Sequence, residues 1–397
     1  MSKPEIVKTF EEKRPVCLMA QMALERLLDR EKLDELFRAT AAEQYERKLL
    51  FSSLVRLMSG VVLCREESVN AAYRKMAGEL GVSLNAVYTK LERMETGLSQ
   101  ALVRYSYAQL KRTSDRLRAY DVCLVAGYTP KILDGNQLSA TEHRLAETRF
   151  STAAPLPGKS LVVLDPRREA IADLFPIEDG HAQERTALDQ VIDTIERKDL
   201  WIADRNFTTL KFLYAIAARG AAFVIRRHGQ LQGRPLGRRR FMGRTKTGRL
   251  YEQELELPPY EGRTLTIRLV ELELFQVTRD GERTLSLLTN LSAEECSAAK
   301  IAEVYRGRWR IETAFQKLTT ALQCELDTLC YPKAALFAFS LACLAYNAVA
   351  VVFAALRAEH GKTRIAELSF HYLSREISQA YDGLMVAIPP RYWAEIR

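Results

Sequence analysis

Residues 304–315 read VYRGRWRIETAF and hold the densest group of candidate functional residues in the chain. On one helix, Tyr305, Arg308 and Glu312 follow one another at i, i+3 and i+7, which directs all three side chains to one face. A carboxylate has the chemistry to hold a divalent metal ion, and a guanidinium has the chemistry to bind a phosphate. The alternative is an amphipathic helix that packs Trp309 and Phe315 inward and leaves its charges in solvent.

Two upstream segments each place an aspartate after a short apolar run. In KILDGNQL, Asp134 follows an expected strand over residues 122–133. In DLWIADRNF, Asp204 follows the apolar residues 200–203, with a helical pattern from Thr208. The carboxyl end of a buried strand is where open α/β sheets present catalytic groups. Two other interpretations stay open, because Asp-Gly is also a turn sequence and the second aspartate is also a helix N-cap residue.

Taken together, the three segments resemble the DDE transposases of the IS4 family, a bacterial cut-and-paste group. The family signature around its third acidic residue is Y-(2)-R-(3)-E-(6)-K, and Tyr305, Arg308 and Glu312 match its first three positions. The fourth position holds Thr319 instead of lysine, and the nearest lysine is Lys317. The segment IADRNF is also similar to the second acidic motif of the family.

The resemblance covers roughly residues 120–350 and implies an α/β fold with a ribonuclease H-like catalytic core. It implies that three carboxylates are catalytic and bind two Mg²⁺ ions, with Mn²⁺ as a substitute: Asp134, Asp204 and Glu312. It also implies DNA contacts beside the scissile phosphate, for which the candidates are Tyr305, Arg308 and Lys317.

The gaps between the three carboxylates indicate an insertion in the core. Asp204 follows Asp134 by 70 residues, which is room for several strands and a helix. Glu312 follows Asp204 by 108 residues, which is too long for one connection in a compact domain. The family resemblance implies a β-rich insertion at this place.

The inserted sequence itself has the pattern of strands. Residues 263–277 alternate apolar and polar side chains, and residues 284–291 form a second expected strand. Asp280 and Gly281 lie between them as a hairpin turn sequence. We therefore expect a β-rich insertion over about residues 225–295.

A basic segment, residues 226–249, lies inside this insertion. No acidic residue occurs between Asp204 and Glu252, whereas twelve lysines or arginines do, nine of them in the basic segment. Five glycines interrupt the segment, which indicates mobile loops of high positive potential that bind DNA through its phosphates. The alternative is a solvated basic loop. The densest cluster of candidate phosphate contacts is Arg238, Arg239 and Arg240.

Composition and charge favour a nucleic-acid partner. The 397 residues are 47% hydrophobic, enough for two or three domains, and carry a formal net charge of +8. Seven cysteines without a CxxC pair argue against a disulfide framework and a zinc site, and the five histidines show no HExxH spacing. The amino terminus lacks the apolar core of a secretory signal. We expect a protein of the reducing cytoplasm.

Residues 334–356 contain no charged side chain and are long enough to span a bilayer. They are rich in alanine and include Ser340 and Asn347. A helix that is apolar on every side is also what the centre of a large domain requires. We expect a buried helix and no membrane partner.

The first 120 residues have the pattern of helices, and residues 76–94 resemble a helix-turn-helix. Gly81 lies at the turn, and Ser83 and Asn85 open the second helix, from which they would reach base edges in a major groove. An ordinary helical hairpin is the alternative.

The resulting prediction is a DNA transposase of three parts. Residues 1–120 form a helical DNA-binding domain, residues 121–350 the catalytic domain with its insertion, and residues 351–397 a helical carboxy-terminal region. The enzyme binds the terminal inverted repeats of an element, cleaves them and joins the 3′-hydroxyl ends to target DNA, as a homodimer on DNA. Two alternatives stay open: a metal-dependent nuclease on the same fold, and a domesticated DNA-binding protein.

Overall fold

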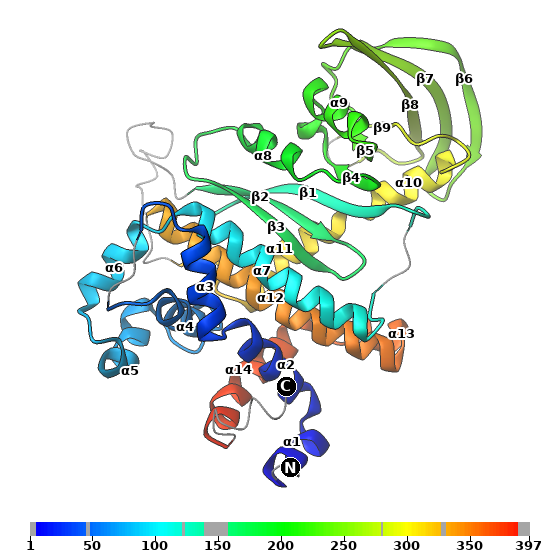
Figure 1. The fold of residues 1–397 in the computed structure, drawn as a ribbon. Helices are drawn as coiled ribbons and strands as arrows, with labels where there is room; N and C mark the ends of the chain where they lie inside the picture. Colours follow the sequence, from blue (N-terminus) through cyan, green and yellow to red (C-terminus); the bar gives the residue numbers. More distant parts are fainter. Residues whose placement is uncertain are drawn as a thin grey trace.

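The computed structural model describes residues 5–44, 48–120, 124–138, 158–278, 281–326 and 331–387. Within these ranges the centre of the molecule is a nine-stranded mixed sheet in the order β3-β2-β1-β4-β5-β9-β8-β7-β6 (Figure 1). The strands are β1 (Thr129–Gln137), β2 (Lys159–Asp165), β3 (Ala170–Ile177), β4 (Asp199–Ala203), β5 (Ala222–Arg226), β6 (Arg234–Arg244), β7 (Gly248–Tyr260), β8 (Arg263–Leu274) and β9 (Thr284–Thr289).

The first five strands combine an antiparallel meander with two parallel strands. β1, β2 and β3 are antiparallel, whereas β4 and β5 run parallel to β1. β4 and β5 are almost wholly apolar and buried, as parallel strands covered on both faces must be. β1 differs from the strand expected over residues 122–133, because it begins at Thr129 and continues past Asp134. Its pairing with β2 extends to Gln137, which supplies the hydrogen-bond partners for this extension. Residues 121–123 lie outside the described part of the chain.

Helices cover both faces of the sheet (Figure 1). On one face, α8 (Leu188–Asp193) and α9 (Leu210–Ala218) share a hydrophobic core with β2, β4, β5, β7 and β8. On the other face, α10 (Ala298–Arg306), α11 (Trp309–Ala321) and α12 (Pro332–His360) share a second core with the amino-terminal helices. The sheet is therefore the middle layer of three, as expected for an α/β protein.

The amino-terminal part of the described chain is helical. Its elements are α1 (Glu5–Lys13), α2 (Pro15–Leu27), α3 (Arg30–Thr40), α4 (Phe51–Val62), α5 (Val69–Leu80), α6 (Leu84–Glu92) and α7 (Thr96–Arg116). α7 packs along β3 and α12, which joins these helices to the sheet. Gly81 ends α5 with a φ of 62°, and the Ser83 hydroxyl accepts the Ala86 N–H at 3.3 Å to begin α6.

The strands β6 to β9 extend the main sheet, because β9 pairs with β5. The strands expected over residues 263–277 and 284–291 are confirmed as β8 and β9. The turn residue Asp280 between them lies outside the described residues.

The basic segment 226–249 is not a set of loops, contrary to the expectation from its glycines. Its centre is β6, an exposed edge strand that pairs with β7 alone. The pairing supplies partners for the β6 backbone, and two shifts of register absorb the irregular sequence.

α12 is buried over residues 334–354, in line with the expectation for residues 334–356. Of the helices in the described ranges, it is the one long and apolar enough to cross a membrane, and protein encloses it. Asn347 is fully hydrogen-bonded in this core: it exchanges two bonds with the Ile171 backbone, at 2.7 and 2.9 Å, and donates to Ser106 Oγ at 3.0 Å. α12 therefore fastens the edge strand β3. The chain continues through α13 (Lys362–Ile365) and α14 (Phe370–Ala387), which packs against α2 and α11.

Candidate active site

Three polar residues form one row across adjacent parallel strands. Leu133 of β1 pairs with Ala203 of β4, and Ala203 pairs with Ile225 of β5. Neighbouring strands lie about 4.8 Å apart, so the residues that follow these partners also start from adjacent positions. We call these three residues the strand row: Asp134, Asp204 and Arg226.

The strand row points toward α10 and α11. Side chains alternate along a strand, and the residues two places earlier, Ile132, Ile202 and Val224, belong to the core that these helices share. Along the strands, the charged strand row therefore comes directly after this apolar layer. It lies where the side chains become partly exposed to solvent. Asp134 and Asp204 retain 20% and 30% of their side-chain exposure.

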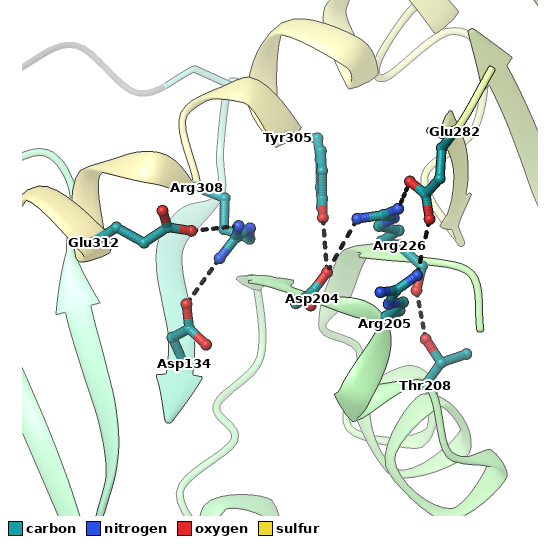
Figure 2. Close-up of polar contacts among 9 residues, drawn as sticks. All are labelled: Asp134, Asp204, Arg205, Thr208, Arg226, Glu282, Tyr305, Arg308 and Glu312. Carbon is teal, nitrogen blue, oxygen red and sulfur yellow. Dashed lines mark hydrogen bonds and ion pairs between the residues drawn. The ribbon is translucent and has the colours of Figure 1, made fainter. Parts of the chain in front are cut away.

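The sequence predicts one continuous helix over residues 304–315, but the structure divides this segment between two helices. α10 ends just before Gly307, and α11 begins just after Arg308. At the junction the Arg308 N–H donates to Tyr305 O at 2.9 Å, a tighter turn than an α-helix makes. The low helix propensity of glycine accounts for the break. Tyr305, Arg308 and Glu312 nevertheless all face the strand row (Figure 2).

Arg308 lies between two carboxylates (Figure 2). Its Nη1 donates to Asp134 Oδ2 at 2.8 Å, and its Nη2 donates to Glu312 Oε1 at 2.6 Å. The Arg308 side chain is only 10% exposed, so these charge-assisted bonds are shielded from water. Burial acts against the charge of Arg308, but Tyr305 and the two carboxylates outweigh it and raise its pKa.

Two residues, neither of them Arg308, contact the Asp204 carboxylate. It directly precedes the 3₁₀ helix η4 (Arg205–Phe207), but its side chain makes no capping bond, and Thr209 caps α9 instead. Tyr305 donates its hydroxyl hydrogen to Asp204 Oδ1 at 3.3 Å, and Arg226 Nη1 lies 3.9 Å from the same oxygen. Burial, and then the charge of Asp204, raise the pKa of Tyr305, so the phenol remains a hydrogen-bond donor.

Glu282 adds a fourth carboxylate at the outer side of the site (Figure 2). It pairs with Arg226 and, at 2.8 Å, with Arg205 Nη1. Thr208 Oγ1 donates to Arg226 O at 2.5 Å, which fastens the end of η4 to β5. Each of the four carboxylates therefore lies beside at least one arginine.

The folded protein destabilises the ionised form of the Asp134 carboxyl group. Burial is the main cause that raises its pKa to about 6, and the charges of Asp204 and Glu312 add to this effect. The Arg308 guanidinium and the Gly135 N–H act in the opposite direction without balancing it. Ionised Asp134 is therefore stabilised by any further positive charge placed beside it.

The donor set has the chemistry that suits a divalent cation of the Mg²⁺ type. Asp134, Asp204 and Glu312 offer carboxylate oxygens, which are the ligands that such ions prefer. In the parts of the chain that the structure describes, no three histidine, cysteine, aspartate or glutamate side chains are grouped to hold an ion. Here Arg308 contributes the positive charge between Asp134 and Glu312.

Gly135 is not part of a turn, which was the alternative interpretation of the Asp-Gly pair. It lies within β1, where a Cβ atom would come 2.1 Å from Glu184 Oε1. Glu184, in η3 (Glu184–Ala187), accepts from Asn206 Nδ2 at 2.7 Å. The glycine therefore makes room for Glu184 on the face of β1 opposite to Asp134.

The three consecutive arginines of the basic segment lie on β6, four strands from β5 in the sheet. Arg238 is exposed, and its side chain has no hydrogen-bond or ion-pair partner among the described residues. Arg239 pairs with Glu271 at 2.7 Å, and Arg240 pairs with Glu252 at 3.4 Å. The structure thus separates these arginines from the three carboxylates and partly neutralises two of them.

The remaining predicted DNA contacts also lie apart from the strand row. The Lys317 ammonium lies over the ring of Phe370, 5.2 Å from its centroid, and burial lowers its pKa. Lys317 therefore faces α14. Ser83 caps α6, and Asn85 is exposed in the first turn of that helix.

Sequence reasoning missed Arg226, Arg205 and Glu282. Arg226 had a recognisable pattern, because AFVIR ends an apolar run in a charged residue just as ILD and IAD do. Glu282 had no recognisable sequence pattern. It is 56 residues from Arg226 in the sequence, and only the fold of the insertion brings the two together.

The comparisons with known proteins give one matching family. A family described as the transposase DDE domain matches residues 159–348, just under half of the chain. No curated protein sequence matches the chain. The matched segment contains Asp204 and Glu312, whereas Asp134 precedes it. Two of the three carboxylates of the site thus fall inside the family match, which supports a DDE transposase.

Proposed function

We propose that this chain is a cut-and-paste DNA transposase of the IS4 type, which cleaves the ends of a mobile element and joins their 3′-hydroxyls to target DNA. The observation that carries the proposal is that Asp134 and Asp204 start from adjacent strand positions, while Arg308 links Glu312 to Asp134. The transposase DDE domain match over residues 159–348 supports the same conclusion.

A ribonuclease H-like core is the fold that this proposal implies. Its support is the mixed order β3-β2-β1-β4-β5, with an antiparallel meander followed by two strands parallel to β1. The parallel pairing of β1 with β4 ends at Leu133 and Ala203, and Asp134 and Asp204 directly follow these partners, at the edge where such sheets present catalytic groups.

Asp134, Asp204 and Glu312 are the residues that would hold two Mg²⁺ ions, or Mn²⁺ in their place. Bound there, the ions would supply Lewis acidity for activating water or a DNA 3′-hydroxyl and for stabilising the leaving oxygen. The chain contributes preorganisation: two neighbouring strands fix the aspartates, and the burial of Asp134 favours a cation at this place.

The side chains around the carboxylates bind and orient. Arg308 and Arg226 carry planar guanidiniums, which match the oxygens of a phosphate. Tyr305 orients Asp204 through its 3.3 Å hydrogen bond. These three residues would hold the phosphate beside the cut and keep Asp204 directed toward it.

Two further regions are assigned to DNA binding in this proposal. The pair α5–α6 presents Ser83 and Asn85 at the start of a helix, as a helix-turn-helix reader requires. The edge strand β6 presents Arg238 to solvent, beside its two partly neutralised neighbours. The formal net charge of +8 favours the polyanion, and the active complex is a homodimer on DNA.

Asp204→Asn tests the proposal directly. Cleavage of a plasmid that carries the DNA flanking this gene should fall by more than about 100-fold, because a ligand of the transition-state cations is lost. Gel-shift affinity should stay within about twofold, since phosphate contacts elsewhere supply it. Asp193→Asn makes the same change on an exposed aspartate at the end of α8 and should leave both properties intact. A parallel loss of affinity and cleavage would make Asp204 a folding residue.

A second assay distinguishes the proposed transposase from the two alternatives, a nuclease and a DNA-binding protein without catalysis. A pre-cleaved duplex with a free 3′-hydroxyl is supplied together with target plasmid and Mg²⁺. Joined product supports a transposase, whereas cleavage without joining would identify a nuclease. Binding without either would identify a DNA-binding protein that has lost catalysis, with Thr319 at the usual lysine position as the first residue to revert.

A further inference from the structure

Arg308 occupies the place between Asp134 and Glu312 that a shared cation would take. Its two terminal nitrogens bond to Asp134 Oδ2 at 2.8 Å and to Glu312 Oε1 at 2.6 Å. A divalent ion of the Mg²⁺ type coordinates carboxylate oxygens at about 2.1 Å and demands a regular geometry. The ion and the guanidinium therefore compete for the same oxygen atoms.

Because both groups are positively charged, a divalent ion can bind here only if the guanidinium moves away. A divalent ion added while Arg308 stays in place would bring two cations together beside a guanidinium that is only 10% exposed, where like charges repel more strongly than in water. The guanidinium needs another anion to replace the carboxylates. A phosphate offers the same paired oxygens as a carboxylate, so it satisfies the arginine equally well.

Arg308 is placed where it can leave its partners. It lies at the junction of α10 and α11, outside the regular hydrogen bonding of either helix. Its Nε is buried without a hydrogen-bond partner in the described structure, so the present arrangement does not satisfy the whole guanidinium. The next residue, Trp309, is 62% exposed, and the surface therefore opens directly beside this junction.

We propose that Arg308 is a placeholder for the catalytic cations and that DNA removes it. In the protein without DNA, Arg308 neutralises Asp134 and Glu312. When DNA binds, one of its phosphates takes the guanidinium and frees the carboxylate oxygens for divalent ions. This inference rests on the proposed function. Because coupling between two ligands is reciprocal, DNA and divalent ions each raise the affinity for the other. Cations then assemble only where a phosphate is already in position to be cut.

The test measures Mn²⁺ binding instead of activity. Free Mn²⁺ is followed by electron paramagnetic resonance during titration of the wild-type chain, Arg308→Gln and Arg306→Gln, each with and without a 40-bp duplex. Arg306 is exposed on α10, so its substitution removes the same charge outside the site. Asp204→Asn gives the background from other sites and from DNA. Arg308→Met, which replaces the aliphatic part of the side chain without its charge, repeats the test if the glutamine variant does not fold.

We expect Arg308→Gln to bind Mn²⁺ at least about tenfold more tightly than the wild type in the absence of DNA, with no further gain when DNA is added. The wild type and Arg306→Gln should gain affinity only with DNA. Unchanged or weaker Mn²⁺ binding by Arg308→Gln without DNA would overturn the placeholder role while leaving the metal site intact. Binding that never exceeds the Asp204→Asn background, with or without DNA, would instead overturn the proposed function and this inference with it.

Discussion

Replacing Asp134 with asparagine should stabilise the folded protein, although it removes a proposed metal ligand. Burial raises the pKa of Asp134 from its ordinary value of 3.8 to about 6. A carboxyl group whose pKa rises on folding favours the folded state at low pH, and this contribution is lost as the pH rises through the folded-state value. Asparagine stays neutral at every pH and therefore avoids the loss.

The magnitude follows from the two pKa values. The difference between 3.8 and about 6 corresponds to about 3 kcal/mol once the group is ionised in both states. Asp134→Asn should therefore raise the free energy of unfolding by about 3 kcal/mol at pH 8. The gain should shrink as the pH falls and drop below about 1 kcal/mol at pH 4, where the folded-state carboxyl is protonated and the unfolded-state carboxyl is only partly ionised.

Urea denaturation followed by circular dichroism, without divalent ions, measures this gain at several pH values between 4 and 8. Asp193→Asn, on the exposed end of α8, is the matched control and should stay within about 0.5 kcal/mol of the wild type throughout. A variant at Asp134 that is less stable than the wild type at pH 8 would refute the reasoning. A gain of equal size at every pH would do the same, because it would come from packing and not from ionisation.

Two other predictions concern the core and the basic edge. Asn347→Ala leaves the N–H and C=O of Ile171 unpaired in the core, so the free energy of unfolding in urea should fall by about 2 to 5 kcal/mol. A loss below about 1 kcal/mol would show that α12 does not fasten β3. Arg238→Gln should reduce the slope of log affinity for duplex DNA against log salt by about 0.9, the value for one phosphate contact. Arg239→Gln should change the slope less, because Glu271 already neutralises that side chain, and an unchanged slope in both would move the DNA contact away from β6.

Strands with a strong apolar pattern were predictable, and strands held by their neighbours were not. β4 follows from the run LWIA, and β8 follows from the alternation over residues 263–277. β6 has neither pattern, because both of its faces are exposed and only its pairing with β7 makes it a strand. β1 was placed too early for a similar reason, since its last residues depend on β2.

The residues of the candidate site also differ in whether the sequence alone predicts them. The acidic residues stood out because each carries a local motif, and the strand pairing brings Asp134 beside Asp204. The break before Arg308 was hidden by a spacing that fits a continuous helix. Glu282 could not be found from sequence, because its role depends on where the insertion folds back toward Arg226.

The return of β9 to the side of β5 has a consequence for how this chain can change. Arg226 at the end of β5 pairs with Leu287 of β9, so the insertion begins and ends at one place beside β5. A segment whose two ends are adjacent can grow or shrink cheaply, since doubling a loop adds only about 0.6 kcal/mol of closure entropy. The tip between β7 and β8, at Glu261 and Gly262, is exposed, and the preceding Tyr260 packs against Tyr214 of α9. It is the natural graft point for a reporter, or for a foreign module that redirects the protein, because the strands that carry the aspartates need not move.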